Sequence, residues 1–322
     1  MIASYARASD TGKKRRRNED SYVVAPPLFA VADGMGGAQA GEVASKLAAA
    51  ALEDTDPGSV AGPEKVTSLI QEANRRVYER AANDPATSGM GTTMTVALVE
   101  GNEVTIGHVG DSRAYVVRNG ELEQLTEDHS LVNELLKSGK LSREEAEMHP
   151  QRSVITRAVG TDPDVDVDAF TVGTGEGDVF LLCSDGLTDM VTDENILDIV
   201  EKHRNDLDRA TKALVSAANR GGGEDNITVI AFAIAAEGDE TARMPATEPD
   251  EDTLTGVPAP AIDTMVVPPE QVEHVFVEPG SPEAEAVSRP QPITPAARVR
   301  LVLTMLALLG VAAVLLVWGL VR

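Results

Sequence analysis

The apolar positions of this chain follow two periods, one typical of strands and one typical of helices. Short runs that are nearly all apolar, or that alternate apolar with polar residues, predict strands, and apolar residues three and four positions apart predict helices. We expect strands at 3–8, 20–25, 28–32, 92–99, 103–109, 112–118, 121–125, 166–172, 178–184 and 226–235. We expect helices at 40–53, 63–82, 193–203 and 206–220.

The order of these elements indicates the fold class. The helices come in antiparallel pairs between blocks of meandering strands, whereas a doubly wound parallel sheet needs about one helix for each strand. Asn119-Gly120 predicts a tight hairpin turn between two of the strands. A polar insert at 128–158 is expected to be mostly helical. The pattern predicts an α+β fold, a four-layer α-β-β-α sandwich of two antiparallel sheets flanked by helices.

The last part of the chain has a different pattern. Residues 301–321 form an apolar run of 21 residues without a charge, enough to cross a bilayer as a helix. Arg298 and Arg300 precede this run and Arg322 follows it, so the positive-inside rule places the preceding part in the cytoplasm. We expect residues 298–322 to be a C-terminal transmembrane helix that contacts membrane lipid and anchors a single-pass protein in the cell membrane.

Composition divides the rest of the chain into two parts. Residues 237–297 contain 13 Asp or Glu, two Arg and 11 Pro without sustained periodicity, which predicts a disordered acidic Pro-rich linker. Residues 1–236 contain 39 Asp or Glu against 23 Lys or Arg, a net charge of −16. That charge argues against a nucleic acid partner and suits divalent cations, which need anionic oxygen ligands. We expect residues 1–236 to be one catalytic domain.

Three aspartates stand out within this domain. Asp33, Asp185 and Asp225 each lie where an apolar strand gives way to glycine or a loop. One Asp-Gly pair signals only a turn. A carboxylate at a strand end beside glycine can also point into a shared cleft while the backbone approaches a metal closely. Three such sites predict the carboxylates of a paired-metal hydrolase.

A basic run, residues 13–17, precedes the acidic pair Glu19-Asp20. Such a run is typical of a solvated surface or a nucleic acid patch. Alternatively, Arg15 holds a phosphate while the two acids face metals, because the guanidinium fork donates two parallel hydrogen bonds. The residues alone leave both interpretations open.

Taken in order, these motifs resemble one known family. The motifs are Arg15-x-x-x-Glu19-Asp20, Asp33-Gly34-Met35-Gly36-Gly37, Gly110-Asp111-Ser112-Arg113, Ser184-Asp185-Gly186 and Asp225-Asn226. They resemble the metal-dependent protein serine/threonine phosphatases of the type 2C class, over about residues 1–235. The tethered layout is similar to bacterial members that oppose transmembrane serine/threonine kinases. The resemblance implies hydrolysis of phosphoserine and phosphothreonine in phosphorylated proteins, including such kinases and their substrates.

The resemblance also implies roles for individual residues. Asp33, Asp185 and Asp225 would ligate one Mn²⁺ or Mg²⁺, and Asp33 with the carbonyl of Gly34 would ligate a second. Glu19 or Asp20 would act partly through water. Asp111, together with Asp185, matches the third-metal site of many bacterial members. The catalytic residues would be Asp33 and Arg15, and Arg15 would bind the substrate phosphate.

Elementary chemistry agrees with these roles. Two metals sharing a carboxylate lie roughly 3.5–4 Å apart, activate a water and neutralise phosphate oxygens. Ligands that are all oxygen favour Mn²⁺ or Mg²⁺ over zinc. Many eukaryotic relatives carry a histidine at the position of Met35, so the resemblance leaves the general acid unassigned.

Two other functions remain as alternatives. One is a catalytically silent pseudophosphatase that docks on a kinase, and the other is a phosphatase of anti-sigma-factor antagonists.

Other residues near these motifs are expected to have structural roles or a role in substrate access. Thr92 and Thr93 are expected to be ordinary strand residues, and the insert at 128–158 resembles the mobile flap of bacterial members.

Overall fold

A computed structural model describes residues 1–36, 40–55, 60–142, 145–146 and 149–235. The strands form two antiparallel sheets. The first sheet has the order β1 (Ile2–Asp10), β11 (Ile227–Ile234), β10 (Val179–Cys183), β7 (Arg113–Arg118) and β8 (Glu121–Gln124). The second has the order β2 (Asp20–Ala25), β3 (Leu28–Met35), β5 (Met94–Glu100), β6 (Glu103–Val109) and β9 (Asp168–Gly173), with β4 (Gly91–Thr92) paired to β3.

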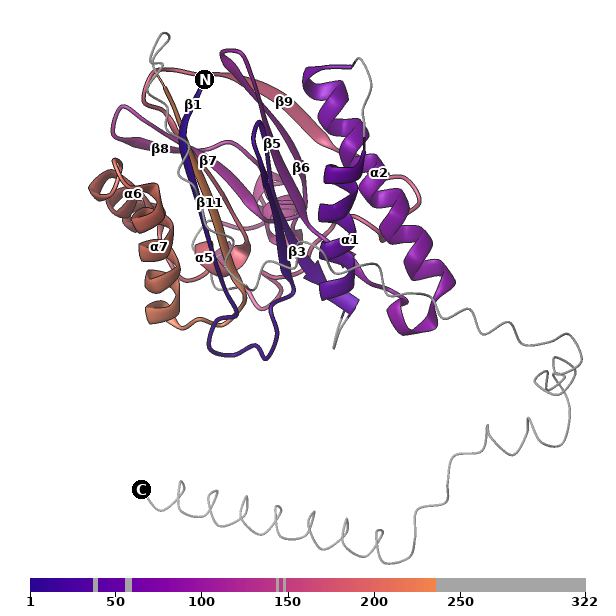
Figure 1. Cartoon of the computed structure of the whole chain (residues 1–322). Helices are drawn as coiled ribbons and strands as arrows, with labels where there is room; N and C mark the ends of the chain where they lie inside the picture. Colours follow the sequence, from indigo (N-terminus) through magenta and orange to yellow (C-terminus); the bar gives the residue numbers. More distant parts are fainter. Residues whose placement is uncertain (37–39, 56–59, 143–144, 147–148, 236–322) are drawn as a thin grey trace, which may run out of the picture. The chain divides into compact units, whose positions relative to one another are not determined.

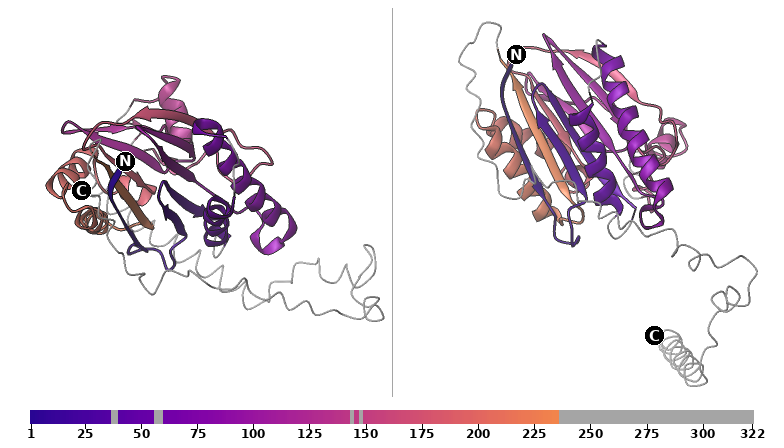
Figure 2. Two further views of the ribbon diagram at one scale, coloured as in Figure 1. Left: turned by 45° about the horizontal axis from the view of Figure 1, so that its top comes forward. Right: turned by 45° about the vertical axis from the view of Figure 1, so that its right-hand side comes forward.

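Helices cover the outer face of each sheet. Helices α1 (Ala40–Asp54) and α2 (Gly62–Asn83) pack on the second sheet, and α6 (Asp193–Lys202) and α7 (Leu207–Gly221) lie against the first (Figures 1 and 2). The shorter helices are η1 (Pro85–Thr87), α3 (Leu131–Lys137) and α5 (Asp185–Thr188). The described residues therefore form the predicted α+β sandwich, with a helical layer on both sides of two antiparallel sheets.

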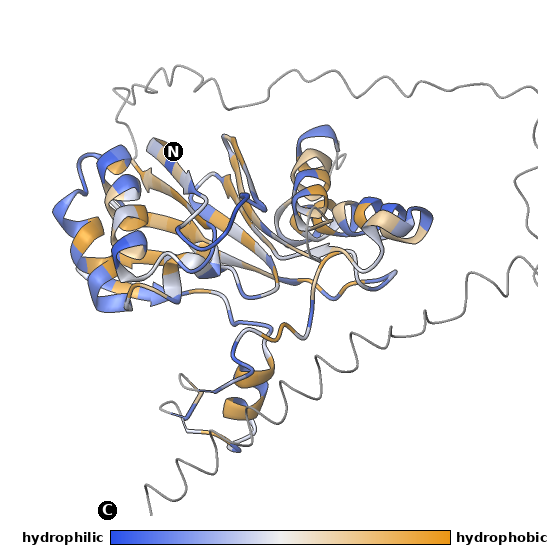
Figure 3. Cartoon of the chain, turned by 90° about the horizontal axis from the view of Figure 1, so that it is seen from below, coloured by the Kyte–Doolittle hydropathy of each residue, from blue (hydrophilic) through white to orange (hydrophobic). Residues whose placement is uncertain are grey.

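Three hydrophobic cores separate the four layers. The ring of Phe232 stacks between the two sheets with Phe29 and with Phe180, at centroid distances of 4.5 and 5.2 Å respectively. One outer core fills the space between α1, α2 and the second sheet, and the other lies between the first sheet and α6 and α7. Figure 3 shows the apolar sides of the helices turned toward the sheets. The central strands are thus buried on both faces, which explains the nearly continuous apolar runs of β5, β10 and β11.

The structure differs from the sequence-based expectations in three places. The insert at 128–158 is not mostly helical, since its described part holds α3 and otherwise mainly turns and loops. The predicted strand at 92–99 is divided into β4 and β5 at Thr93. The strand predicted to end at 184 stops at Cys183, and a one-turn helix, α5, begins at Asp185.

The predicted linker at 237–297 and the predicted transmembrane helix at 298–322 lie outside the described residues. Among the helices that are described, none is both long and apolar enough to span a membrane.

Candidate metal centre

The register of two strands brings the first pair of carboxylates together. Asp20 on β2 is the direct partner of Asp33 on β3. Residues directly opposite in an antiparallel pair point to the same face, with Cβ atoms about 4.5–5.5 Å apart. Asp20, predicted as a secondary ligand, therefore lies beside Asp33, the predicted central ligand.

Two threonines fix the backbone of Asp33. The Asp33 N–H donates to Thr93 Oγ1 at 2.9 Å. The Asp33 carbonyl accepts from Thr92 Oγ1 at 2.8 Å and from the Thr93 N–H at 2.9 Å. Both threonines are buried, and the break between β4 and β5 turns them toward β3. Sequence reasoning missed this role, because a threonine in an apolar run is an ordinary strand residue.

Close backbone packing positions Gly34 and Glu19. A Cβ on Gly34 would lie 2.1 Å from the Gly41 carbonyl oxygen, so no other residue fits where β3 meets the start of α1. The Gly34 N–H donates to the Glu19 carbonyl, and a Cβ on Gly41 would lie 2.8 Å from Glu19 Oε2. The Glu19 carboxylate therefore lies beside the Gly34–Gly41 contact, at the same end of the sandwich as Asp33.

The first sheet contributes Asp185 and Asp225. Asp185 is the first residue of α5, where the free N–H groups of a helix start favour a negative charge. A Cβ on Gly186 would lie 2.0 Å from the Asn226 carbonyl oxygen, so this glycine allows α5 to pack against the start of β11. Asp225 and Asp185 consequently lie at adjoining ends of β11 and β10.

Two buried side chains join the sheets at this end. Ser184 Oγ donates to Asp20 Oδ2 at 2.8 Å and accepts from the Thr228 N–H. Asn226 accepts from the Glu19 N–H at 2.7 Å and donates to the carbonyls of Thr11 and Arg17. The acidic groups therefore come from both sheets, and neutral hydrogen bonds hold the sheets together beneath them.

The acidic side chains act on one another electrostatically. Burial raises the pKa of Asp33 well above its usual value, and the charges of Asp20, Asp185, Asp111 and Asp225 raise it further. Burial likewise raises the pKa of Asp185 well above its usual value, and the charges of several other aspartates raise it further. Burial also raises the pKa of Asp20 to about 6, against the hydrogen bonds it accepts. The structure thus gathers Asp33, Asp185, Asp225, Asp20 and Asp111 into one cluster.

Glu19 and Arg15 lie at one side of this cluster. Burial raises the pKa of Glu19, and the charge of Arg15 opposes that rise. Arg15 Nη2 donates to Asp225 Oδ2 at 2.5 Å, and about half of the Arg15 side chain is exposed. The guanidinium makes no other hydrogen bond to a described residue, so most of its donors remain for a ligand.

Asp111 and Asp189 lie at the other side. Burial raises the pKa of Asp111 to about 7, and the charges of Asp128 and Asp189 add to the rise. Asp189 follows α5, four residues after Asp185. Its Oδ2 lies 3.9 Å from Nε of Arg152 in the insert. Sequence reasoning missed Asp189. The signal was the i, i+4 spacing from Asp185, which has meaning only if a helix starts there.

The donor set fits a divalent cation. Asp20 Oδ1 and Asp185 Oδ1 are buried without a hydrogen-bond partner in the described structure. Buried carboxylate oxygens without partners are costly, and bound cations relieve that cost. Every candidate donor is an oxygen, as Mg²⁺ and Mn²⁺ prefer. In the part of the chain that is described, no three His, Cys, Asp or Glu side chains are already arranged around a single ion position.

The chain is similar in sequence to known proteins. A family model described as protein phosphatase 2C matches residues 13–219. A serine/threonine phosphatase, Stp of Listeria welshimeri, is 41% identical over 233 residues, which cover 69% of this chain and 92% of the relative. The serine/threonine protein phosphatase PstP of Mycobacterium tuberculosis is 38% identical over 297 residues, which cover 90% of this chain and 56% of the relative.

Solved structures are similar over the same region. The crystal structure of the Mycobacterium tuberculosis phosphatase PstP/Ppp superposes with a TM-score of 0.69 at 40% identity, covering 73% of this chain and all of that one. The catalytic domain of a PstP phosphatase in complex with two manganese ions superposes with a TM-score of 0.66 at 39% identity, covering 72% of this chain and 98% of that one.

Proposed function

Since this chain belongs to the protein phosphatase 2C family, we propose that it is a membrane-anchored enzyme whose catalytic domain works in the cytoplasm beside serine/threonine kinases. It is a metal-dependent phosphoprotein phosphatase that hydrolyses phosphoserine and phosphothreonine with Mn²⁺ or Mg²⁺. We further propose which residues carry out this hydrolysis and where in the cell it takes place.

One observation carries the assignment of the metal ligands. Carboxylates from both sheets form one cluster, and two of their buried oxygens have no partner among the described residues. We assign metal binding to Asp33, Gly34 through its carbonyl, Asp185 and Asp225, with Glu19, Asp20 and Asp111 at the edges of the cluster. Mn²⁺ or Mg²⁺ held there supplies a water that is nucleophilic at neutral pH and positive charge for the phosphate oxygens.

Arg15 binds the substrate phosphate in this proposal. Its exposed guanidinium lies beside Asp225, and the donors that Asp225 leaves free can hold phosphate oxygens in a forked pair of hydrogen bonds. Thr92 and Thr93 keep Asp33 in place, because they satisfy its backbone N–H and carbonyl. A carboxylate held in this way needs no rearrangement when substrate arrives, which lowers the barrier to reaction.

Met35 does not act as the general acid. It follows Gly34 at the end of β3, and a thioether has no proton to give to the leaving serine or threonine alkoxide. The proton for the alkoxide therefore comes from a donor other than Met35.

The membrane location rests on the tail of the chain. Residues 301–321 carry no charge and are nearly all apolar, and the acidic segment before them would have a typical end-to-end span of about 45 Å if it were a flexible coil. The similarity to PstP extends over 297 residues, which is longer than the catalytic domain. A catalytic domain joined to the membrane by such a segment can reach phosphorylated proteins there, including transmembrane kinases.

The activity of the full-length protein tests the ligand assignment. We expect Mn²⁺-dependent hydrolysis of p-nitrophenyl phosphate and of a phosphothreonine peptide, and loss of both on chelation. Asp185→Asn should lose most of the rate and weaken Mn²⁺ binding in calorimetry, whereas Asp198→Asn, on the exposed face of α6, should match the unaltered protein. Full rate and full Mn²⁺ affinity in Asp185→Asn would refute the ligand assignment. A protein with no Mn²⁺-dependent turnover would instead favour the silent docking module.

The location has its own test. Cell fractionation should find the full-length protein with the membrane and a chain that lacks residues 298–322 in the soluble fraction. Equal distribution of the two forms would contradict the anchor.

A further inference from the structure

Five consecutive basic residues form the tip of the loop between β1 and β2. Lys13, Lys14, Arg15, Arg16 and Arg17 are all exposed, and we call them the basic loop. They account for five of the 23 Lys and Arg in residues 1–236, a region with 39 Asp and Glu. An exposed positive patch on a strongly acidic domain draws anions to one place.

The backbone of the basic loop is fastened to the metal-ligand loop. The N–H groups of Lys13 and Lys14 both donate to the Gly223 carbonyl, at 2.7 and 3.1 Å. Gly12 has φ +75°, and a Cβ there would lie 2.1 Å from the Asp225 carbonyl oxygen. Asn226 holds both ends of the loop through the carbonyls of Thr11 and Arg17. The positive charges therefore have a fixed place beside Asp225.

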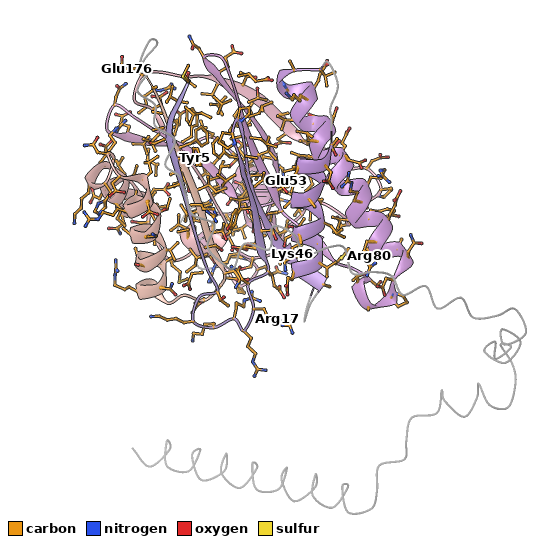
Figure 4. All side chains as sticks on the ribbon, viewed as in Figure 1. Tyr5, Arg17, Lys46, Glu53, Arg80 and Glu176 are labelled. Atoms are coloured by element: carbon orange, nitrogen blue, oxygen red, sulfur yellow. The ribbon has the colours of Figure 1, made fainter. Side chains whose placement is uncertain are left out.

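The members of the basic loop differ in their partners. Arg15 pairs with Asp225, and Arg17 lies 3.6 Å from Glu42 of α1. Lys14 and Arg16, the two neighbours of Arg15, form no ion pair with any residue that the structure describes. Figure 4 shows Arg17 at the end of the molecule formed by this loop. Charges that flank the proposed phosphate-binding arginine and remain unpaired suit an anionic partner.

We propose that the basic loop selects phosphorylated protein segments that carry further negative charge, from Asp, Glu or a second phosphate, close to the phosphoserine or phosphothreonine. This inference rests on the proposed function and deepens it. If the segment binds in an extended form, each residue spans at most roughly 3.3–3.6 Å, so the residues next to the phosphorylated one come within reach of Lys14 and Arg16. Without the basic loop, the acidic catalytic domain would repel such a segment.

A pair of matched peptides tests the proposal with the full-length enzyme. Both peptides contain one phosphothreonine, and the two residues on each side of it are Glu in one peptide and Gln in the other. These peptides have nearly the same shape and differ in charge. We expect kcat/KM about fivefold higher for the Glu peptide at low ionic strength, mostly through KM, and a ratio near one at about 1 M salt, where the screening length is about 3 Å.

Two double variants separate the basic loop from a general charge effect. Lys14→Glu/Arg16→Glu should lower the Glu-to-Gln ratio below one. Lys202→Glu/Arg209→Glu makes the same change in net charge at exposed positions near the N-terminal end of α7, whereas the basic loop lies near the C-terminal end. This variant should keep the Glu-to-Gln ratio of the unaltered enzyme. Arg209 and Gly221 are 12 residues apart on this helix, roughly 18 Å by the helical rise.

Each remaining outcome has a definite meaning. A ratio of one in the unaltered enzyme, or a preference that Lys14→Glu/Arg16→Glu leaves unchanged, would overturn the proposal. The unaltered enzyme could instead show a ratio of one and sediment with anionic phosphatidylglycerol vesicles, while Lys14→Glu/Arg16→Glu does not sediment. That result would also overturn the proposal and would assign the loop to the membrane surface. Absence of Mn²⁺-dependent turnover on p-nitrophenyl phosphate would refute the proposed function itself, independently of the peptide ratio.

Discussion

His129 and Gly110 are joined by two reciprocal hydrogen bonds. The Gly110 N–H donates to the His129 ring at Nδ1 at 3.0 Å, and the His129 N–H donates to the Gly110 carbonyl at 2.7 Å. His129 belongs to the insert and is buried, and Gly110 directly precedes Asp111. The first residues of the insert therefore hold the backbone that carries one of the proposed ligands.

Replacing His129 with Phe should lower stability. The phenyl ring has no acceptor, so the Gly110 N–H stays buried without a partner, and the contacts of His129 Nε2 with Asp168 and Arg157 are lost as well. We expect the free energy of unfolding in urea to fall by about 1–3 kcal/mol. His203→Phe is the control, because the side chain of His203 makes no hydrogen bond to a described residue. Equal stability of the two variants would show that the hydrogen bonds of the His129 ring, including the one from Gly110, contribute nothing.

Replacing Thr93 with Val should damage the site directly. Valine has the same shape but cannot accept from the Asp33 N–H, which Thr93 Oγ1 now satisfies. We expect kcat/KM to fall between about tenfold and a hundredfold, because small misplacements of catalytic groups are costly. Thr171→Val, at an exposed position of β9, is the matched control, because it removes a hydroxyl that hydrogen-bonds with Thr105 and not with Asp33. If both variants kept full activity, the hydrogen bond to Asp33 would have no part in catalysis.

His108 should make stability depend on pH. Burial lowers the pKa of His108 to about 4, and the neighbouring His129 also lowers it. Since the folded pKa is below the unfolded value of about 6.5, the unfolded state binds more protons between these values, and the stabilisation is lost as pH falls. We expect this group to contribute about 3 kcal/mol at pH 7 that disappears toward pH 4.

Urea unfolding of the protein and of His108→Gln measures this contribution. Other titrating groups cancel in the difference between the two proteins, so the stability advantage of His108 should shrink as pH falls from 7 to 4. A difference that stays constant over that range would contradict the lowered pKa.

Asp185→Asn should change stability in opposite directions with and without metal. In chelator, the variant removes a buried charge whose Oδ1 has no partner among the described residues, so we expect a gain of about 0.5–2 kcal/mol. With Mn²⁺ in excess, the unaltered protein should become the more stable one, since an ion that binds only the folded state stabilises it. Thermal unfolding in both conditions checks the sign. A variant that is less stable in chelator as well would contradict the view that Asp185 is strained without an ion.

The sequence predicted most of this arrangement because the signals were local. Apolar periodicity located both sheets and four of the helices, and carboxylates at strand ends identified Asp33, Asp185 and Asp225. The resemblance added Asp20, and the register of β2 and β3 then placed it opposite Asp33. These features depend on residues within a few positions of each other.

The features that sequence reasoning missed depend on contacts between distant segments. Thr93 reaches Asp33 only because the chain breaks between β4 and β5, and no period in the sequence marks that break. Ser184 meets Asp20 across 164 positions. The insert at 128–158 was predicted to be mostly helical, yet its first residues are held by hydrogen bonds to a distant strand end, such as the contact of His129 with Gly110. Such contacts become visible only in three dimensions.

The site draws its acidic groups from both sheets. An ion held by Asp33 of one sheet and by Asp185 and Asp225 of the other would act as a cross-link between the two halves of the domain. The sheets could then separate only by releasing the ion, so we expect manganese starvation to silence the enzyme and to expose it to proteases at the same time. Cellular levels of the protein would then follow metal supply without any dedicated sensor.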